Sequence, residues 1–139
     1  MGLEKIISYS MSMSTRILIA DDEGINRLFI KTVLAGNGWE VEEAANGRTA
    51  LELVEQNPFD AVILDVMMPV MDGKQAAGKI RALEQELGRR ACILLGLTAY
   101  AEKELIDELM RLGMDGVIHK PITQDSLVQK LNQMLDERD

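Results

Sequence analysis

Five side chains of the kinds that bind metal ions and phosphoryl groups stand at intervals along the chain. They are the adjacent carboxylates Asp21 and Asp22, a third carboxylate at Asp65, the hydroxyl of Thr98 and the ammonium of Lys120. Carboxylates that share one crevice raise one another's pKa unless a cation neutralises them. Magnesium takes oxygen ligands, typically one or two carboxylates with phosphate oxygens and water. The residue types therefore favour a hard divalent ion, and Mn²⁺ is an alternative to Mg²⁺.

Asp65 is the carboxylate best placed to act as a nucleophile, because it ends a predicted buried central strand and is held rigidly there. A covalent aspartyl-phosphate is then reasonable, with Lys120 supplying a point charge and Thr98 a hydrogen bond. A zinc site is not expected, because the chain offers only His119 and Cys92 as typical zinc ligands, without ligand spacing.

Short apolar runs alternate with segments of helical period, a pattern typical of βαβ units that build a parallel sheet. The predicted strands are Arg16–Ala20, Glu40–Ala44, Ala61–Leu64, Cys92–Leu97 and Gly116–His119. The run at Glu40–Ala44 is more polar than the others, so we expect it at an edge of the sheet. The carboxyl ends of parallel strands share one edge, where ligands bind, and the five polar side chains follow four of these strands.

Helices are predicted between the strands from apolar residues spaced along one face. Their apolar faces comprise Ile25, Leu28, Phe29, Thr32 and Val33 in the first helix, Ala76, Ile80, Leu83 and Leu87 in the third, Leu105, Ile106, Leu109 and Leu112 in the fourth, and Leu127, Val128, Leu131, Met134 and Leu135 in the fifth. A second helix is placed around Thr49–Glu55, and Thr123 is the predicted N-cap of the fifth.

Composition limits the classes of protein that fit. The chain has 139 residues, enough for one domain, and its formal charge of −8 opposes direct binding of nucleic acid. No apolar stretch approaches the roughly 18 residues needed to cross a bilayer, so no membrane contact is expected. The single cysteine, Cys92, lies in an apolar run and is expected to be buried and reduced. A cytoplasmic location is predicted.

The ordered set Asp21-Asp22, Asp65, Thr98-Ala99 and Lys120-Pro121 resembles the receiver domain of two-component response regulators, together with the loop from Asp65 to Gly73 that reads Asp-Val-Met-Met-Pro-Val-Met-Asp-Gly. The similarity covers roughly residues 15–135. It implies a flavodoxin-like (βα)5 fold, a five-stranded parallel sheet with helices on both faces. Residues 15–139 are assigned to the domain and residues 1–14 to a flexible leader or linker remnant.

The resemblance also implies a function and a ligand set. Mg²⁺ would be held by Asp22, Asp65 and the backbone carbonyl of Met67, with Asp21 assisting largely through water. A histidine kinase or histidine phosphotransfer protein would donate the phosphoryl group to Asp65. Thr98 would then move to meet that group and Lys120 would pair with it, while the Lys120–Pro121 bond would be cis. Such a domain is a signalling switch rather than an enzyme, and a phosphorylation-dependent dimer is possible.

Two positions bear on how the switch would work. The family often has an aromatic residue three positions before the lysine, where this chain has Val117. Tyr100 and Met67 occupy positions that tune phosphoryl lifetime in the family, and their bulk leads to the hypothesis of slow dephosphorylation. The expected readout face comprises the fourth helix, the fifth strand and the fifth helix, with exposed residues such as Glu102, Lys103, Asp107, Gln124 and Asp125.

Three other interpretations were weighed. A haloacid-dehalogenase-like phosphatase needs a second acid two residues after its nucleophile, but Met67 stands there after Asp65, and Glu23 follows Asp21 in that place. A dinucleotide-binding enzyme needs a glycine-rich phosphate loop after the first strand, which the acidic residues replace. The remaining alternative is a phosphorylation-independent, receiver-like interaction module. The chain is expected to be a stand-alone receiver or part of a longer protein such as a hybrid sensor kinase.

Overall fold

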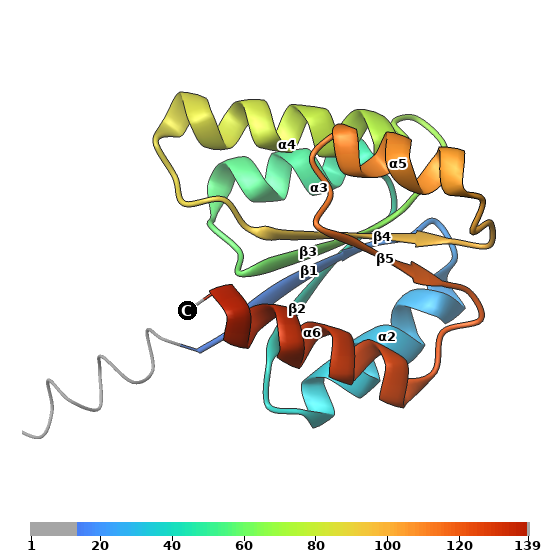
Figure 1. Ribbon diagram of the computed structural model, residues 1–139. Helices are drawn as coiled ribbons and strands as arrows, with labels where there is room; N and C mark the ends of the chain where they lie inside the picture. Colours follow the sequence, from blue (N-terminus) through green and yellow to red (C-terminus); the bar gives the residue numbers. More distant parts are fainter. Residues whose placement is uncertain (1–13, 139) are drawn as a thin grey trace, which may run out of the picture.

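Five parallel strands form one sheet in the order β2-β1-β3-β4-β5 (Figure 1). The structure is a computed structural model that describes residues 14–138. The strands are β1 (Arg16–Ala20), β2 (Glu40–Ala44), β3 (Ala61–Asp65), β4 (Ile93–Thr98) and β5 (Gly116–His119). This strand order is that of the flavodoxin-like doubly wound folds, so the predicted fold class is confirmed. The polar strand β2 lies at an edge, as its composition predicts.

Helices cover both faces of the sheet, with α3, α4 and α5 on one face and α2 and α6 on the other (Figure 1). Their bounds are α2 Gly24–Gly36, α3 Gly47–Gln56, α4 Gly73–Leu87, α5 Lys103–Arg111 and α6 Gln124–Arg138. Each layer of helices encloses its own hydrophobic core. A sheet covered on both faces requires strands that are apolar on both sides, which explains the continuous apolar runs.

The central strand β3 shows this directly. Its residues are all buried, with Val62 and Leu64 in the core under α3 and α4, and Ala61 and Ile63 in the core under α2 and α6. Asp65 continues this strand by one residue beyond the predicted end. The carboxylate therefore stands at the end of a strand whose residues are all buried.

Side-chain caps fix the starts of three helices. Asn46 accepts from the Thr49 N–H at the start of α3, and Asp72 forms a reciprocal capping box with Gln75 at the start of α4. The predicted cap of α6 is confirmed, because Thr123 Oγ1 accepts from the Ser126 N–H at 3.1 Å.

The predicted apolar face of α2 was wrong except at Val33, which packs against the core. The helix buries Ile30 and Leu34, whereas Ile25, Leu28 and Phe29 are 83%, 64% and 42% exposed. Ile25, Leu28 and Phe29 form one apolar stripe along the helix and Ile30 with Leu34 form another, so periodicity alone could not tell the core face from the outer face. Leu87, at the end of α4, is likewise exposed rather than packed.

Other predictions are settled by burial or fall outside the structure. Cys92 is a buried free thiol, as expected, although β4 begins one residue after it. Burial raises the pKa of this thiol to about 12. Nearly all of the leader predicted over residues 1–14 lies outside the described residues. Within residues 14–138, no helix has the length and apolarity needed to span a membrane.

Candidate functional site

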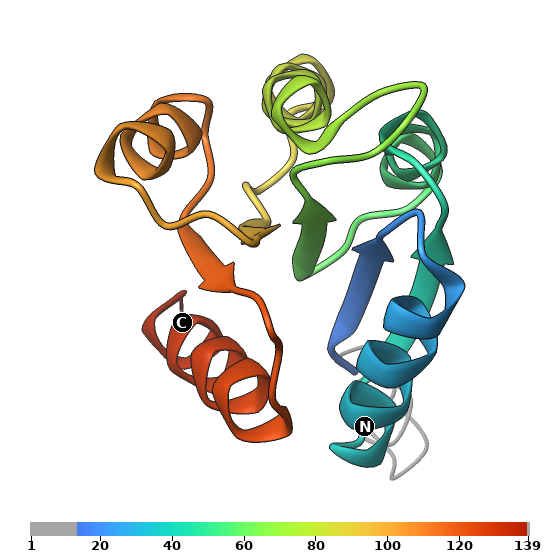
Figure 2. The same ribbon diagram turned by 90° about the vertical axis from the view of Figure 1, so that its right-hand side faces the viewer.

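The strand register brings the predicted site residues to one edge of the sheet. Ala20 pairs with Leu64 across β1 and β3, so Asp21 follows one strand beside Asp65 at the end of its neighbour. Thr98 pairs with His119 across β4 and β5, so Lys120 follows directly beyond Thr98. Figure 2 turns the molecule so that this edge can be followed from one strand to the next.

Three carboxylates form the acidic part of the site. Oxygen atoms of Asp21, Asp22 and Asp65 all lie within 4.8 Å of one another. Asp21 is fully buried and Asp65 is 3% exposed, whereas Asp22 is exposed. The sequence prediction that these side chains converge is therefore confirmed.

Asp21 is held by the turn that leads into α2. Its Oδ1 accepts from the Glu23 N–H at 2.9 Å, and the Arg27 guanidinium donates to its backbone carbonyl at 2.7 Å. Burial raises the pKa of the Asp21 carboxyl, and the charge of Asp65 raises it further. The Glu23 hydrogen bond, the Lys120 charge and the Asn26 amide lower this pKa. The net pKa lies above the ordinary value because desolvation dominates.

Asp65 is bound on both of its oxygens. Oδ2 accepts from the Lys120 ammonium at 2.7 Å, and Oδ1 accepts from the Met67 N–H at 3.1 Å. Burial lowers the pKa of Lys120, but the hydrogen bond and charge of Asp65 outweigh it and leave the pKa raised. Lys120 therefore stays an ammonium. The Lys120–Pro121 peptide bond is cis, as the resemblance implied.

The loop after β3 closes tightly over the strand end. The Gly73 N–H donates to the Val66 carbonyl at 3.1 Å. A Cβ on Gly73 would lie 2.4 Å from the Asp65 carbonyl oxygen, so only glycine fits without displacement of the backbone. The Asp-Gly pair of the recognised motif thus has two roles, a helix cap and a close backbone approach.

Thr98 ends β4 with a buried side chain. Its Oγ1 accepts from the Tyr100 N–H at 3.0 Å, which leaves the hydroxyl proton available for another acceptor. The His119 ring nitrogen Nε2 lies 3.0 Å from the Ala99 carbonyl oxygen and donates to it. Tyr100 itself is exposed, and no aromatic residue stands at Val117, which packs against the core.

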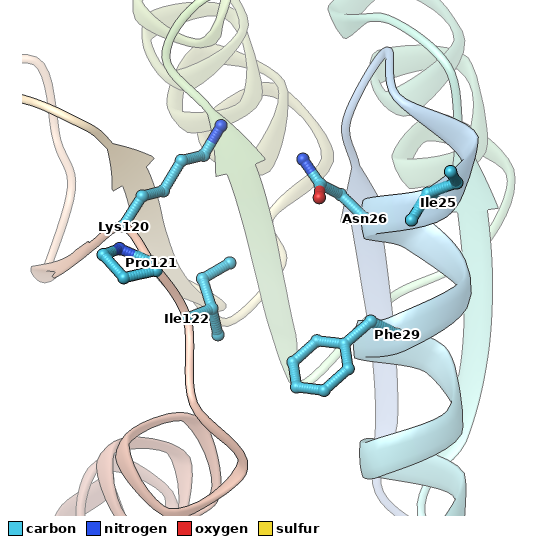
Figure 3. A pocket seen from close by; sticks show the side chains of 6 residues that line it. All are labelled: Ile25, Asn26, Phe29, Lys120, Pro121 and Ile122. Atoms are coloured by element: carbon cyan, nitrogen blue, oxygen red, sulfur yellow. The ribbon is translucent and has the colours of Figure 1, made fainter.

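A pocket with a volume of about 350 Å³ opens beside Lys120. It is lined by Ile25, Asn26, Phe29, Lys120, Pro121 and Ile122 (Figure 3). Figure 3 shows Phe29 and Ile122 facing each other across it, while the Lys120 side chain extends toward the end of β3. Sequence reasoning assigned the apolar residues of α2 to the core and missed this pocket. A usable signal was the excess of apolar residues at the start of that helix.

The acidic cluster fits a divalent cation such as magnesium. Asp21 Oδ2 is buried and has no hydrogen-bond partner among residues 14–138, which is costly for a carboxylate unless a cation or water occupies the adjoining space. Oxygen atoms alone make up the cluster, as hard cations prefer. Lys120 supplies only one positive charge to the three carboxylates.

Comparison with known proteins identifies the family. The family model described as "response regulator receiver domain" matches residues 17–132. The chain is 39% identical over 118 residues to the sensor protein GacS of Pseudomonas syringae pv. syringae. The aligned region is 85% of this chain but only 13% of that protein, so the chain spans a small part of the length of this relative. The chain belongs to the response regulator receiver domain family.

Solved structures agree with this assignment. The chemotaxis protein CheY4 of Vibrio cholerae is 31% identical, with a TM-score of 0.79 over 86% of this chain and 98% of that one. The receiver domain of the sensor histidine kinase PA1611 from Pseudomonas aeruginosa PAO1 is also 31% identical, with a TM-score of 0.78 over 88% of this chain and 98% of that one. That structure has a magnesium ion coordinated in its active-site cleft.

Proposed function

We propose that this chain is a phosphorylation-controlled switch in which Asp65 accepts a phosphoryl group from a phosphohistidine. The observation that carries the proposal is the pairing of Asp65 Oδ2 with Lys120 at 2.7 Å inside a cluster of three carboxylates. Membership of the receiver family supports the same role. A switch of this kind modulates its own phosphorylation but is not a classical enzyme.

The transfer is a displacement at phosphorus. An oxygen of the Asp65 carboxylate forms a bond to phosphorus, and the bond from phosphorus to the donor nitrogen breaks with its electron pair on the nitrogen. Lys120 then pairs with a phosphoryl oxygen instead of with the free carboxylate. The Thr98 hydroxyl accepts from the Tyr100 N–H, so its own O–H is free to donate a hydrogen bond to another phosphoryl oxygen.

Asp21, Asp22, Asp65 and the Met67 backbone carbonyl are the proposed ligands of a resident Mg²⁺, and Mn²⁺ would satisfy the same oxygen donors. When bound, the ion neutralises charge on the phosphoryl oxygens. The proposal is supported by the unpartnered buried Oδ2 of Asp21 and by the all-oxygen cluster.

A histidine kinase or histidine phosphotransfer protein is the proposed donor. The exposed residues Ile25, Leu28 and Phe29 form an apolar patch at the start of α2, next to the pocket beside Lys120. An amphipathic partner helix could cover this patch and bring its histidine to Asp65. The negative net charge argues against nucleic acid as a partner, and the buried Cys92 is compatible with the proposed cytoplasmic location.

Phosphorylation would be read out through the loop after β4. A phosphoryl group that draws the Thr98 hydroxyl shifts this loop and the helix α5 that follows it, because Thr98 Oγ1 accepts from the Tyr100 N–H and the Ala99 carbonyl between them accepts from the His119 ring on β5. The face comprising α5, β5 and α6 is the proposed contact for an output partner or for a second copy in a phosphorylation-dependent dimer.

Slow dephosphorylation is proposed from the bulk at the mouth of the site. Met67 and Tyr100 both have exposed side chains there. These side chains restrict the approach of water to the phosphoryl group. Measured decay of the aspartyl-phosphate should be slower than seconds, and replacement of both residues by alanine should shorten its lifetime.

The test of the proposed function is intact-mass spectrometry after incubation with acetyl phosphate and Mg²⁺. Wild type should gain one phosphate, and Asp65→Asn, which keeps the shape of the side chain, should gain none. Omission of Mg²⁺ or addition of a chelator should abolish the gain in wild type. Phosphate on the variant, or none on wild type, would refute the assignment.

A further inference from the structure

The pocket beside Lys120 has apolar walls and two polar side chains. Ile25, Phe29, Pro121 and Ile122 form the walls, and Asn26 and Lys120 are the polar residues. The Lys120 ammonium is already held by Asp65 at 2.7 Å. Asn26 is the other polar lining residue, and its carboxamide carries two N–H donors.

Asn26 projects from the first turn of α2 with its carboxamide directed across the opening toward Lys120 (Figure 3). The same amide lowers the pKa of the Asp21 carboxyl by hydrogen bonding, so one of its two N–H groups faces Asp21 and the other remains for a molecule in the pocket. Asn26 therefore stands between the acidic cluster and the apolar pocket, on the path by which a donor reaches Asp65.

We propose that Asn26 is a residue specific for nitrogen-linked phosphodonors, and that its amide N–H donates a hydrogen bond to the ring nitrogen that releases the phosphoryl group. This inference rests on the proposed function of Asp65. The pocket takes the imidazole ring between Phe29 and Ile122, and the carboxamide contacts the polar edge of the ring.

The phosphorus–nitrogen bond breaks and its electron pair stays on the ring nitrogen, while the Asp65 oxygen bonds to phosphorus. The ring leaves neutral because its other nitrogen keeps the proton that it carried before transfer. The released lone pair faces the apolar walls of the pocket, which offer it no hydrogen-bond donor, so a donor from Asn26 stabilises it.

An acyl phosphate lacks this need. Its leaving carboxylate is small, carries its charge into water and does not have to fill the apolar pocket. Removal of the Asn26 amide should therefore slow transfer from a phosphorylated imidazole much more than transfer from an acyl phosphate. A purely structural role, or a role through Asp21 and its metal, would slow both donors equally.

The experiment compares N-phosphoimidazole with acetyl phosphate as donors to wild type, Asn26→Leu and Asn26→Ala, with Mg²⁺, by intact-mass time courses. Asn26→Leu keeps similar volume, and Asn26→Ala leaves the pocket open. Asn132→Leu, at an exposed position on α6, is the matched control. Loss of one hydrogen bond should lower the rate of phosphorylation of the Asn26 variants roughly tenfold with N-phosphoimidazole and less than about twofold with acetyl phosphate.

Each outcome decides the inference. A donor-selective fall in both Asn26 variants, absent from Asn132→Leu, supports it. An equal fall with both donors, or no fall with N-phosphoimidazole, overturns it while leaving Asp65 as the phosphoacceptor. Failure of both donors to phosphorylate wild type overturns the proposed function, and this inference with it.

Discussion

Replacement of Asp21 by asparagine should stabilise the protein when no divalent metal is present. Carboxylate oxygens of Asp21 and Asp65 lie within 4.8 Å of each other, so their repulsion is about 3.5 kcal/mol at an effective dielectric constant of about 20. Asparagine retains an oxygen that can accept from the Glu23 N–H. Loss of the attraction between Asp21 and Lys120 offsets part of the gain, so the expected increase in the free energy of unfolding is about 2 kcal/mol.

The effect should depend on pH with a defined sign. The pKa of Asp21 is raised above 3.8 in the folded protein, because burial disfavours the charged form. Folded wild type therefore holds a proton that the unfolded chain releases, and its stability falls as pH rises from 3.8 through the folded pKa. The gain in the free energy of unfolding from Asp21→Asn should be small below pH 3.8 and complete above the folded pKa of Asp21.

Urea unfolding in a chelator at low ionic strength, repeated over a pH series, measures both effects. Asp136→Asn, an exposed carboxylate on α6, is the control and should change little. Mg²⁺ should raise the melting temperature of wild type more than that of Asp21→Asn. Equal or lower stability of Asp21→Asn at neutral pH without metal would refute the reasoning from charge repulsion.

Three further measurements test the loop that closes over the site and the buried groups at the opposite edge of the sheet. Gly73→Ala places a Cβ 2.4 Å from the Asp65 carbonyl oxygen and should cost about 3 kcal/mol in urea unfolding; a cost under about 0.5 kcal/mol would contradict the close approach. Cys92, with its pKa raised to about 12 by burial, should not react with a thiol reagent at pH 8 until the protein is unfolded; rapid reaction in the folded protein would show that the thiol is accessible. Glu84→Ala removes a buried carboxylate that accepts from the Cys92 N–H at 2.7 Å and should cost about 3 kcal/mol, whereas exposed Glu86→Ala should cost little; equal costs would contradict this.

The sequence alone was sufficient for the sheet and for the convergence of the site residues. Apolar runs separated by helical segments specify a parallel sheet, and in such a sheet the strand ends meet at one edge. Asp21, Asp65 and Lys120 lie at the ends of three of these strands, so the sequence was enough to predict that they lie close together. The polar composition of Glu40–Ala44 likewise specified the edge strand.

Only the tertiary structure decided which face of α2 is buried. Ile25, Phe29 and Ile30 are all apolar, and periodicity cannot choose between faces when a helix carries apolar residues on two sides. Packing of α2 against β1, β2 and α6 buries Ile30 and leaves the other two beside Lys120. The pocket, and the position of Asn26 within it, result from that choice, because a pocket wall is formed by residues that are distant in sequence.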